Sequence, residues 1–491
     1  MLFNSYFFIF CFLPICLIGY FGINKIFKSK NPSLIWLIGC SLFFYGYFNW
    51  SYLLILLCSI SVNWSAVLIM RKTQGSKKKL LEVCGIVFNV GLIFYFKYYD
   101  FFITNFNKVF YTEFNLKHLV LPLGISFFTF QQISFIVDSY RNETSDYTII
   151  EYVLYVSFFP QLIAGPIVLQ NELVPQFRCK EKRKVNWKYI SRGCYLFVIG
   201  LFKKVLVADT FGIAVDWGYQ HADLLSSVDA WIIMLSYTFQ IYFDFSGYCD
   251  MASGIAAMFN IDLPINFDSP YKAFSITEFW KRWHITLTRF LRKYIYFPLG
   301  GSKKGKVRTY INMMIVFLVS GIWHGANWTF VVWGMLHGTA QVINRIFKEK
   351  WEKLHLATQW GLTFIFVNFA WAFFRAESIA QALKIIWRGI NFRNLNISSE
   401  LVDCFSTVEI KGVRWILQST LVWNKFYNSY WINGFLAWVW IGGALYVVLN
   451  KENAQKITPT YDVKHAIGLA FIFVWVIVSL SGVSTFLYFN F

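Results

Sequence analysis

Two histidines lie in apolar, tryptophan-rich surroundings typical of a membrane. His284 ends the run Phe279-Trp-Lys-Arg-Trp-His, and His324 lies in the motif Trp-His-Gly. The stretch 311–330 around His324 is otherwise almost wholly apolar. An ionisable side chain inside a bilayer is costly and by default marks a functional site. Imidazole is also the side chain best suited to moving protons near neutral pH. The pair therefore predicts proton-transfer chemistry within a membrane.

The neighbours of His324 suit a buried general base. Trp323 can wall a substrate site, Gly325 lets a ligand or another backbone approach closely, and Asn327 offers an amide three residues on. The alternative for His324 is a hydrogen bond to a neighbouring helix. For His284 the alternative is an interfacial histidine that faces lipid headgroups.

The segment around His284 is basic and amphipathic. Trp280 and Trp283 alternate there with lysine and arginine over residues 276–300. This pattern predicts one or two helices at the cytoplasmic interface, where the two tryptophans can contact a substrate. His337 follows His324 by thirteen residues, which does not place both on the same face of one helix. A packing role suits His337 at least as well as a chemical one.

Composition places the chain in a membrane. Of its 491 residues, 57% are hydrophobic and 14% are charged, whereas a soluble domain is usually about 45–50% apolar and about 25% charged. Apolar runs of about 20 residues, enough to cross a hydrocarbon core, recur from end to end. Helices are the expected spanning elements because a backbone in lipid must satisfy its own hydrogen bonds. We expect an all-α, polytopic membrane protein that forms one domain over residues 1–491.

Eleven apolar segments are predicted to span the membrane, and the first lacks the basic leader and cleavage site of a signal peptide. The segments are 3–23, 32–49, 51–70, 80–96, 188–208, 229–248, 309–324, 327–346, 359–375, 432–449 and 465–485. Two further apolar segments, 121–125 and 158–166, are broken by proline and glycine. They must be buried in protein or line a cavity. Gln240, Asp244 and Ser246 interrupt one span, either lining a pore or, as we prefer, linking helices.

The net charge of +19 arises from short loops between the apolar runs. Lys and Arg accumulate on the cytoplasmic side of membranes, so topology explains these charges better than nucleic-acid binding does. The same loops would attract anionic lipid headgroups or an anionic cytosolic ligand. Placing them inside leaves both termini on the extracytoplasmic side.

Several other chemistries lack their sequence signals. The nine cysteines contain no CxxC pair and stand mostly in apolar segments, so we expect small buried hydrophobes. No HExxH, Walker, dinucleotide-binding or GxSxG motif occurs, and we expect no metal site.

The chain ends in an aromatic cluster, residues 486–491, which contains Tyr488. An aromatic belt at the outer membrane interface is the simplest interpretation. A phenol can also act as a covalent nucleophile where a base is near.

Five segments, taken in this order, resemble motifs of the membrane-bound O-acyltransferase family. The similarity is to the bacterial polysaccharide branch, which includes the alginate O-acetyltransferase membrane subunit, and it runs through most of the chain. The segments are Pro122–Gln131, Phe159–Pro166, Tyr242–Tyr248, Phe279–His284 and Trp323–Gly325.

The resemblance implies a fold and an activity. It implies many helices around a central tunnel, with re-entrant or interfacial helices beside them, in a bacterial cytoplasmic membrane. His324 matches the catalytic histidine of the family, and His284 matches the second family histidine. The acyl donor would be cytosolic acetyl-CoA, and a secreted SGNH-type, esterase-like partner would pass the acyl group to an exported glycan.

The same resemblance gives the C-terminus a role. Residues 486–491 look like a terminal aromatic motif of this branch, whose tyrosine is implicated as an acyl carrier in teichoic acid D-alanylation. Tyr488 is therefore expected to carry the acyl group at the outer face, with His324 assisting the transfer.

Two other functions remain open on the sequence. Broken apolar segments and polar groups at membrane depth also suit a transporter or flippase of a lipid-linked sugar. A lipid- or protein-directed acyltransferase of the same fold would need no secreted partner. The acceptor glycan, the acyl length and the oligomeric state cannot be read from the residues.

Overall fold

The computed structural model describes residues 1–144, 146–392, 394–406, 430–457, 462–480 and 486–487. Every regular element within these residues is a helix, which confirms the predicted all-α class. The contacts within the chain divide it into two compact units, and the single domain expected over residues 1–491 stays a prediction. Unit 1 comprises Met1–Leu201, Tyr248–Ile265 and Thr458–Phe491, and unit 2 comprises Phe202–Gly247 and Asn266–Ile457.

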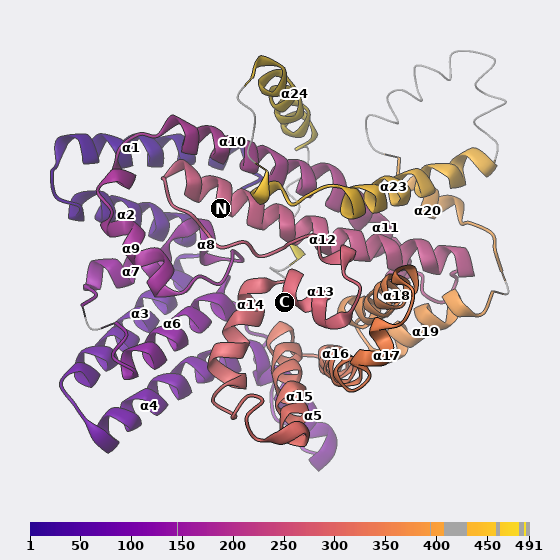
Figure 1. Ribbon diagram of the computed structural model, residues 1–491, viewed down its shortest axis with the longest axis horizontal. Helices are drawn as coiled ribbons and strands as arrows, with labels where there is room; N and C mark the ends of the chain where they lie inside the picture. The colour runs from indigo at the N-terminus through magenta and orange to yellow at the C-terminus, as the bar shows by residue number, and fades with distance from the viewer. Residues whose placement is uncertain (145, 393, 407–429, 458–461, 481–485, 488–491) are drawn as a thin grey trace. The chain divides into compact units, whose positions relative to one another are not determined.

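Unit 1 is built mainly from the N-terminal helices, coloured indigo to magenta in Figure 1. Its helices are α1 (Leu13–Ile26), α2 (Asn31–Gly46), α3 (Trp50–Arg71), α4 (Gly75–Ile93), α5 (Tyr99–Phe110), α6 (Ile125–Tyr140), α7 (Ile149–Ser157), α8 (Phe159–Leu162), α9 (Gln170–Arg178), nearly all of α10 (Trp187–Phe202), and α24 (Val463–Ser479).

Unit 2 carries both candidate histidines. Its helices are α11 (Asp209–Gln220), α13 (Ile276–Arg282), α14 (Ile285–Leu291), α15 (Gly305–His324), α16 (Trp328–Ile346), α17 (Lys348–Glu352), α18 (Leu356–Arg375), α19 (Ile379–Ile390), α20 (Ser399–Asp403) and α23 (Tyr430–Asn450). The long helix α12 (Ser227–Met258) belongs to unit 2 through Gly247 and to unit 1 beyond it.

Five described helices are long and apolar enough to cross a membrane, and Val463–Ser479 is apolar but shorter. The five are Phe8–Ile26, Trp50–Arg71, Gly75–Phe110, Leu356–Arg375 and Gly434–Lys456. They overlap the predicted spans 3–23, 51–70, 80–96, 359–375 and 432–449. The remaining predicted spans stay predictions.

A buried polar network joins three neighbouring helices of unit 1, α3, α4 and α6 (Figure 1). Ser59 and Asn63 of α3, Asn89 of α4 and Gln132 of α6 are all fully buried. Ser59 Oγ donates to Gln132 Oε1 at 2.6 Å, and Asn89 Nδ2 donates to Asn63 Oδ1 at 2.6 Å. Asn63 Nδ2 in turn donates to Gln132 Oε1. Such bonds link helices that lipid alone would not hold together.

A carboxylate near the start of α7 gathers two cations. Glu151 is buried, and its carboxylate accepts hydrogen bonds from Lys30 Nζ at 2.6 Å and Arg178 Nε at 2.7 Å. It also accepts the Thr148 backbone N–H at 2.9 Å in a capping box. Burial acts to raise the pKa of Glu151, but these hydrogen bonds outweigh it and lower the pKa to about 2. The cluster fixes α7 against the chain around Lys30 and Arg178.

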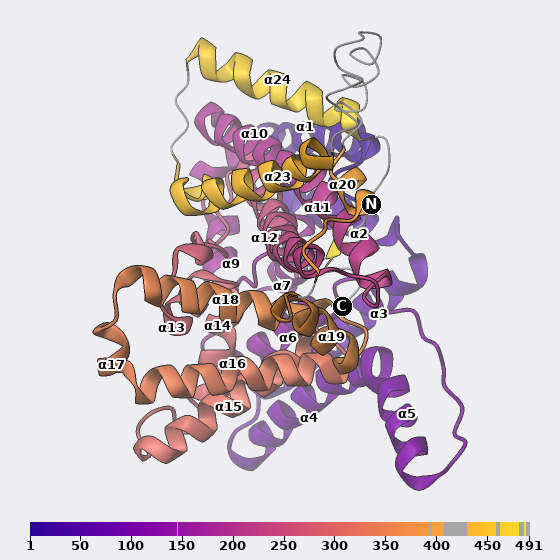
Figure 2. The same cartoon turned by 90° about the vertical axis from the view of Figure 1, so that its right-hand side faces the viewer.

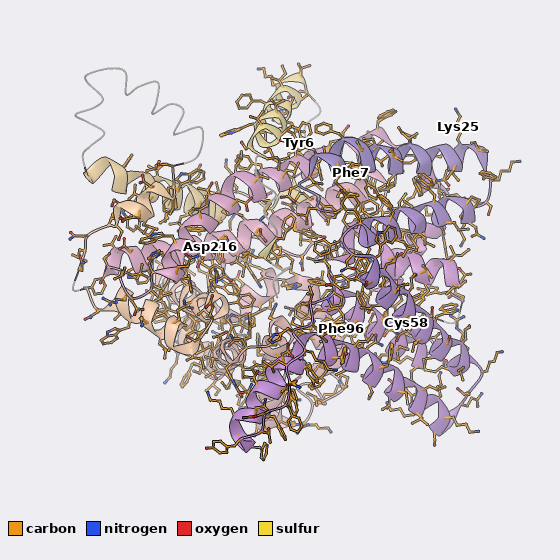
Figure 3. All side chains as sticks on the ribbon, turned by 180° about the vertical axis from the view of Figure 1, so that it is seen from behind. Tyr6, Phe7, Lys25, Cys58, Phe96 and Asp216 are labelled. Carbon is orange, nitrogen blue, oxygen red and sulfur yellow. The ribbon has the colours of Figure 1, made fainter. Side chains whose placement is uncertain are left out.

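The broken segments of unit 1 are buried, as their sequence required. Residues 121–124 precede α6 without helical structure, and Pro160 and Ala164 lie in the interior around the short helix α8. Elsewhere in unit 1, Tyr6 and Phe7 lie near one end of α1 and Lys25 lies at the other (Figure 3).

A buried ion cluster supports the start of unit 2. Lys204 Nζ lies 2.8 Å from Asp244 Oδ1 on α12 and 2.7 Å from Asp209 Oδ1 on α11. The side chains of Lys204 and Asp244 are both nearly inaccessible, so each charge needs the other. Asp244 therefore links elements, as we preferred from the sequence, and Gln240 and Ser246 are buried on the same helix.

Helices α15, α16 and α18 of unit 2 run side by side, with α16 in the middle (Figure 2). Glycines let α15 and α16 approach closely. A Cβ on Gly321 would lie 2.3 Å from Phe330 O, and one on Gly334 would lie 2.5 Å from Phe317 O. No side chain fits at either place, so the two glycines set the spacing of the helices that carry His324 and Trp333.

Candidate active site

A tight junction between α13 and α14 positions His284. Ser275 Oγ caps α13 by accepting the Glu278 N–H at 3.1 Å, and α13 ends at Arg282. His284 then adopts a left-handed conformation with φ 45° and ψ 54° before α14 begins. This conformation costs a non-glycine residue on the order of 1–3 kcal/mol and persists only where surrounding structure holds it.

Asn266 holds the His284 ring. Its side-chain oxygen lies 3.1 Å from His284 Nδ1, and it also accepts the Thr286 backbone N–H at 3.2 Å and the Thr286 hydroxyl at 2.8 Å. Because this oxygen is an acceptor, we assign the proton to Nδ1, which leaves Nε2 as the basic nitrogen. His284 is fully buried. The alternative that it faces lipid headgroups is therefore wrong.

Burial also sets the charge of His284, which lies outside the five candidate spans. It lowers the pKa of the ring from its ordinary 6.5 to about 3. The imidazole is therefore neutral at physiological pH, and its Nε2 carries a lone pair rather than a proton.

His324 is the last residue of α15 and lies beside His284. It is 3% exposed, and the centroids of the two imidazole rings are 6.4 Å apart. Trp333 and Phe374 meet the His324 ring edge-on at 5.2 Å and 5.1 Å, and Trp323 lies at 4.8 Å. The two histidines that the sequence singled out thus share one aromatic enclosure within unit 2.

The predicted substrate-binding tryptophans occupy different places. Trp323 lies 6.2 Å from His284 as well as next to His324. Trp283 is buried, 4.9 Å from the Trp371 ring. Trp280 is also buried, but one side of it lines a cavity. Their contact with a substrate stays a prediction.

His337 is a structural neighbour of this site. It is fully buried, and its Nδ1 accepts the Trp280 indole N–H at 3.1 Å. The His337 ring also lies 4.8 Å from Trp333, which packs on His324. His337 therefore connects Trp280 to the surroundings of His324, which agrees with a packing role.

The motif residues after His324 are used to connect helices. Asn327 Oδ1 caps α16 by accepting the Thr329 N–H at 3.1 Å, and Asn327 Nδ2 donates to Glu377 O at 2.9 Å. A Cβ on Gly325 would lie 2.0 Å from the Phe330 ring. The group that approaches Gly325 closely, as expected from the sequence, is thus the Phe330 side chain. Substrate binding by Asn327 stays a prediction.

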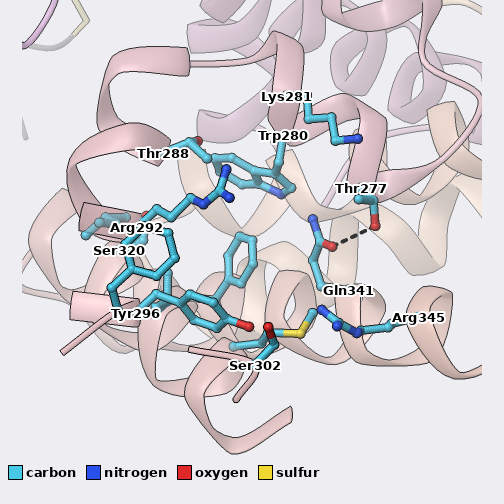
Figure 4. A pocket seen from close by; sticks show the side chains of 15 residues that line it. Thr277, Trp280, Lys281, Thr288, Arg292, Tyr296, Ser302, Ser320, Gln341 and Arg345 are labelled. Atoms are coloured by element: carbon cyan, nitrogen blue, oxygen red, sulfur yellow. Dashed lines mark hydrogen bonds between the residues drawn. The ribbon is translucent and has the colours of Figure 1, made fainter. Parts of the chain in front are cut away.

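A cavity of about 350 Å³ opens beside this cluster in unit 2 (Figure 4). Its lining includes Trp280, Ser320, Arg292, Gln341 and Arg345. Sequence reasoning missed all of these except Trp280. The basic pattern of 276–300 pointed toward Arg292, and the spacing of four residues from Ser320 to His324 places both on one face of α15.

Tyr488 lies outside the described residues. Phe486, two positions earlier, is 1% exposed and meets the Tyr248 ring edge-on at 4.9 Å, both within unit 1. This part of the terminal cluster packs against protein, which differs from the aromatic belt considered above.

Among the described residues, no three His, Cys, Asp or Glu side chains group as metal ligands would.

The arrangement can move a proton in apolar surroundings. Two buried imidazoles lie together, one with an assigned basic Nε2, and aromatic rings enclose both. Such a site can deprotonate a hydroxyl as it attacks an acyl group.

Comparison with known proteins identifies the family of the chain. The sequence model of the membrane-bound O-acyltransferase family matches residues 137–380, which include both histidines and Asn266. The chain is 46% identical over 418 residues to the peptidoglycan O-acetyltransferase of Helicobacter pylori, covering 79% of each chain. It is 36% identical over 399 residues to a probable alginate O-acetylase, AlgI, of Azotobacter vinelandii, covering 79% of this chain and 77% of the relative.

A more distant similarity, 25% over 280 residues, is to the teichoic acid D-alanyltransferase of Bacillus subtilis, covering 53% of this chain and 70% of the relative. These matches support an enzyme over the transporter alternative. The chain is a multi-pass O-acyltransferase that belongs to the membrane-bound O-acyltransferase family.

Proposed function

We propose that this protein transfers an acetyl group from cytosolic acetyl-CoA, through the membrane, to the machinery that O-acetylates an exported glycan. The relative from Helicobacter pylori is a peptidoglycan O-acetyltransferase, and the one from Azotobacter vinelandii is named a probable alginate O-acetylase. Peptidoglycan is the better candidate acceptor because the higher identity is to the peptidoglycan enzyme.

The observation that carries the proposal is the paired burial of His284 and His324, with ring centroids 6.4 Å apart. In our mechanism, a basic imidazole nitrogen of His324 takes the proton from an attacking hydroxyl. The oxygen bonds to the thioester carbonyl carbon, the C–S bond breaks, and the leaving thiolate takes the proton from the imidazolium. His284, held by Asn266, supports this proton transfer.

The attacking hydroxyl in this proposal is the phenol of Tyr488. A phenol has a pKa of about 10, so its oxygen leaves an ester more readily than an alkyl alcohol does. The O-acetyl tyrosine would therefore remain activated for a second transfer. An extracytoplasmic SGNH-type protein would accept the acetyl group on a serine and deliver it to the glycan. This requires the C-terminus to lie outside, as the distribution of basic loops favours.

The test uses Tyr488→Phe, which removes only the hydroxyl. Mass spectrometry of the cell's glycan should find O-acetylation abolished, while the protein remains in the membrane at its normal level. Tyr6→Phe, at an exposed tyrosine near the other terminus, is the matched control and should retain acetylation. Normal acetylation in the Tyr488→Phe strain would overturn the relay.

The partner is tested separately. If a lipid or a protein were the true acceptor, no secreted SGNH protein would be needed. Deleting an adjacent gene for such a protein should then leave acetylation intact, whereas our proposal expects glycan acetylation to cease.

A further inference from the structure

One side chain of α12 reaches the active site directly. The Phe245 ring meets the His284 ring edge-on, with centroids 4.9 Å apart, and it also meets the Phe267 ring at 5.0 Å. Tyr242, three residues earlier and on the same face of α12, lies 6.4 Å from the ring of Trp283, the residue before His284. This face of α12 therefore forms part of the wall that holds the His284 ring.

The other face of α12 packs against α11 and carries polar groups. Gln240 and Asp244 are four residues apart, so they share one face, roughly opposite to the face that meets His284. A Cβ on Gly212 of α11 would lie 2.8 Å from Gln240 Nε2, so the two helices approach closely there. One turn further along α12, Asp244 Oδ1 lies 2.8 Å from Lys204 Nζ.

The local backbone gives Lys204 its position. Lys204 belongs to η4 (Lys203–Ala208), a π-helix between α10 and α11. The backbone N–H of Asp209 donates to Lys204 O, five residues earlier. This wider turn brings the two side chains to one side, which positions five apart in an α-helix would not share. Lys204 Nζ therefore reaches Asp209 Oδ1 at 2.7 Å as well as Asp244.

A buried ion pair is a costly way to hold a helix. The side chains of Lys204 and Asp244 are 3% and 2% exposed, and such a pair is often no more stabilising than apolar side chains in its place. The pair does fix a direction, because a carboxylate that must meet Lys204 sets the rotation of α12 about its axis. Phe245 is the next residue, so the same rotation sets how its ring meets His284.

We propose that Lys204 and Asp244 are positioning residues for acyl transfer: they fix the rotation of α12 so that Phe245 holds the His284 ring in its productive orientation. This role rests on the proposed function, in which His284 supports proton transfer. It also explains the segment Tyr242–Tyr248, one of the five family-like motifs, as a helix with one face pinned by charge and the other set against the site.

The test uses Lys204→Met/Asp244→Val in the full-length purified protein. Both replacements are apolar, so the double variant should keep its melting temperature, whereas either single change leaves a buried charge without its partner and should lower it. Release of coenzyme A from acetyl-CoA gives kcat and KM. We expect kcat of the double variant to fall about tenfold because a catalytic group is misplaced, with KM for acetyl-CoA unchanged. An unchanged kcat would overturn the proposal.

Phe245→Leu tests the same contact with the ion cluster intact. It removes the ring that meets His284 and should lower kcat about as much as the double variant does, again with KM unchanged. A parental kcat in the folded Phe245→Leu protein would contradict the proposal even if the double variant did not fold.

The matched control makes the same replacements at an exposed ion pair of unit 2. Lys384 on α19 pairs with Asp223, and both side chains are exposed. Exposed pairs contribute little to stability. Lys384→Met/Asp223→Val should therefore keep kcat and KM within about twofold of the parent, and a tenfold loss there would show that the assay responds to any lost ion pair, which would overturn the assignment.

The sharpest measurement combines each variant with His284→Ala. If the ion pair and Phe245 act through His284, neither should lower kcat further once the imidazole is gone, because the substitutions are then fully coupled. Losses that multiply would overturn the positioning role, since they would arise without His284. A residue that only stabilises the fold has no reason to show this coupling.

These outcomes separate the inference from the proposed function. If His284→Ala itself keeps the parental rate, the role of His284 in proton transfer is wrong, and the positioning role falls with it. If His284→Ala loses transfer while the Lys204/Asp244 and Phe245 variants keep it, only the positioning role is overturned.

Discussion

The polar network of unit 1 and the histidine site of unit 2 place buried polar side chains in different surroundings. In unit 1, Ser59, Asn63, Asn89 and Gln132 hydrogen-bond to one another across three helices. In unit 2, the two histidines are surrounded by aromatic rings, and the hydrogen bond between His284 and Asn266 orients the His284 ring. Both groups are costly in a membrane. We infer that the polar network of unit 1 serves the fold, whereas the two imidazoles enclosed by aromatic rings serve the chemistry.

The largest effect expected, short of removing His324 or Tyr488, is that of His284→Ala. Losing a group that supports proton transfer should lower acetyl transfer about a hundredfold, with the melting temperature little changed. Asn266→Ala, which leaves the imidazole but frees its orientation, should show a smaller loss of the same kind. Rates of transfer per folded molecule are the measurement. If His284→Ala unfolds the protein while Asn266→Ala transfers normally, His284 belongs with the structural polar groups.

A smaller effect is expected for His337→Phe. This change keeps an aromatic ring but leaves the buried Trp280 N–H without its acceptor, a cost of about 1–3 kcal/mol. Because Trp280 is a predicted substrate-binding residue, we expect the KM for acetyl-CoA to rise about tenfold while the pH profile of kcat keeps its shape. His337→Asn, which can still accept a hydrogen bond, should recover part of the loss. A changed pH profile would instead make His337 a participant in proton transfer.

The smallest expected effect is the loss of stability on replacing Glu151 in unit 1, and it depends on pH. The folded-state pKa of Glu151, about 2, is below the ordinary value of 4.5. The ionised Glu151 carboxylate therefore stabilises the folded protein fully above pH 4.5, and this stabilisation is lost as pH falls toward 2. Glu151→Gln should destabilise the protein by about 2 kcal/mol near neutral pH, and the difference from the parent should shrink in acid. Thermal melts across pH, with the exposed Glu113→Gln as control, measure this. A difference that stays constant from pH 7 to pH 3 would contradict the role of Glu151.

The local sequence pattern predicted which residues are reactive, but it did not predict what surrounds them. His284 and His324 could be selected from the sequence because histidine is rare in apolar segments, and the structure brings their rings together. Asn266 could not be selected, since it lies eighteen residues from His284 in a stretch without regular structure, and only the fold brings it to the ring. The burial of His284 was equally hidden, because a basic, tryptophan-rich helix predicts an interfacial position.

For the fold too, the sequence did not predict contacts between elements that are distant in the chain. Apolar length predicted the helical class and five of the spans, but it could not predict the ion cluster of Lys204, Asp209 and Asp244, whose members come from three elements. The cavity was invisible for the same reason. Thr277 lies on α13, Arg292 directly after α14 and Gln341 on α16, and they meet only through the packing of these elements.

The contrast between the units is tested most directly by measuring acetyl transfer per folded molecule for His324→Ala and Asn63→Ala side by side. We predict that His324→Ala loses transfer at least about a hundredfold at an unchanged melting temperature. Asn63→Ala should have a lower melting temperature, because buried hydrogen bonds contribute about 1 kcal/mol each to stability. Its rate of acetyl transfer should stay within about twofold of that of the parent. Retained transfer in His324→Ala, or selective loss of transfer in a stable Asn63→Ala, would contradict the account.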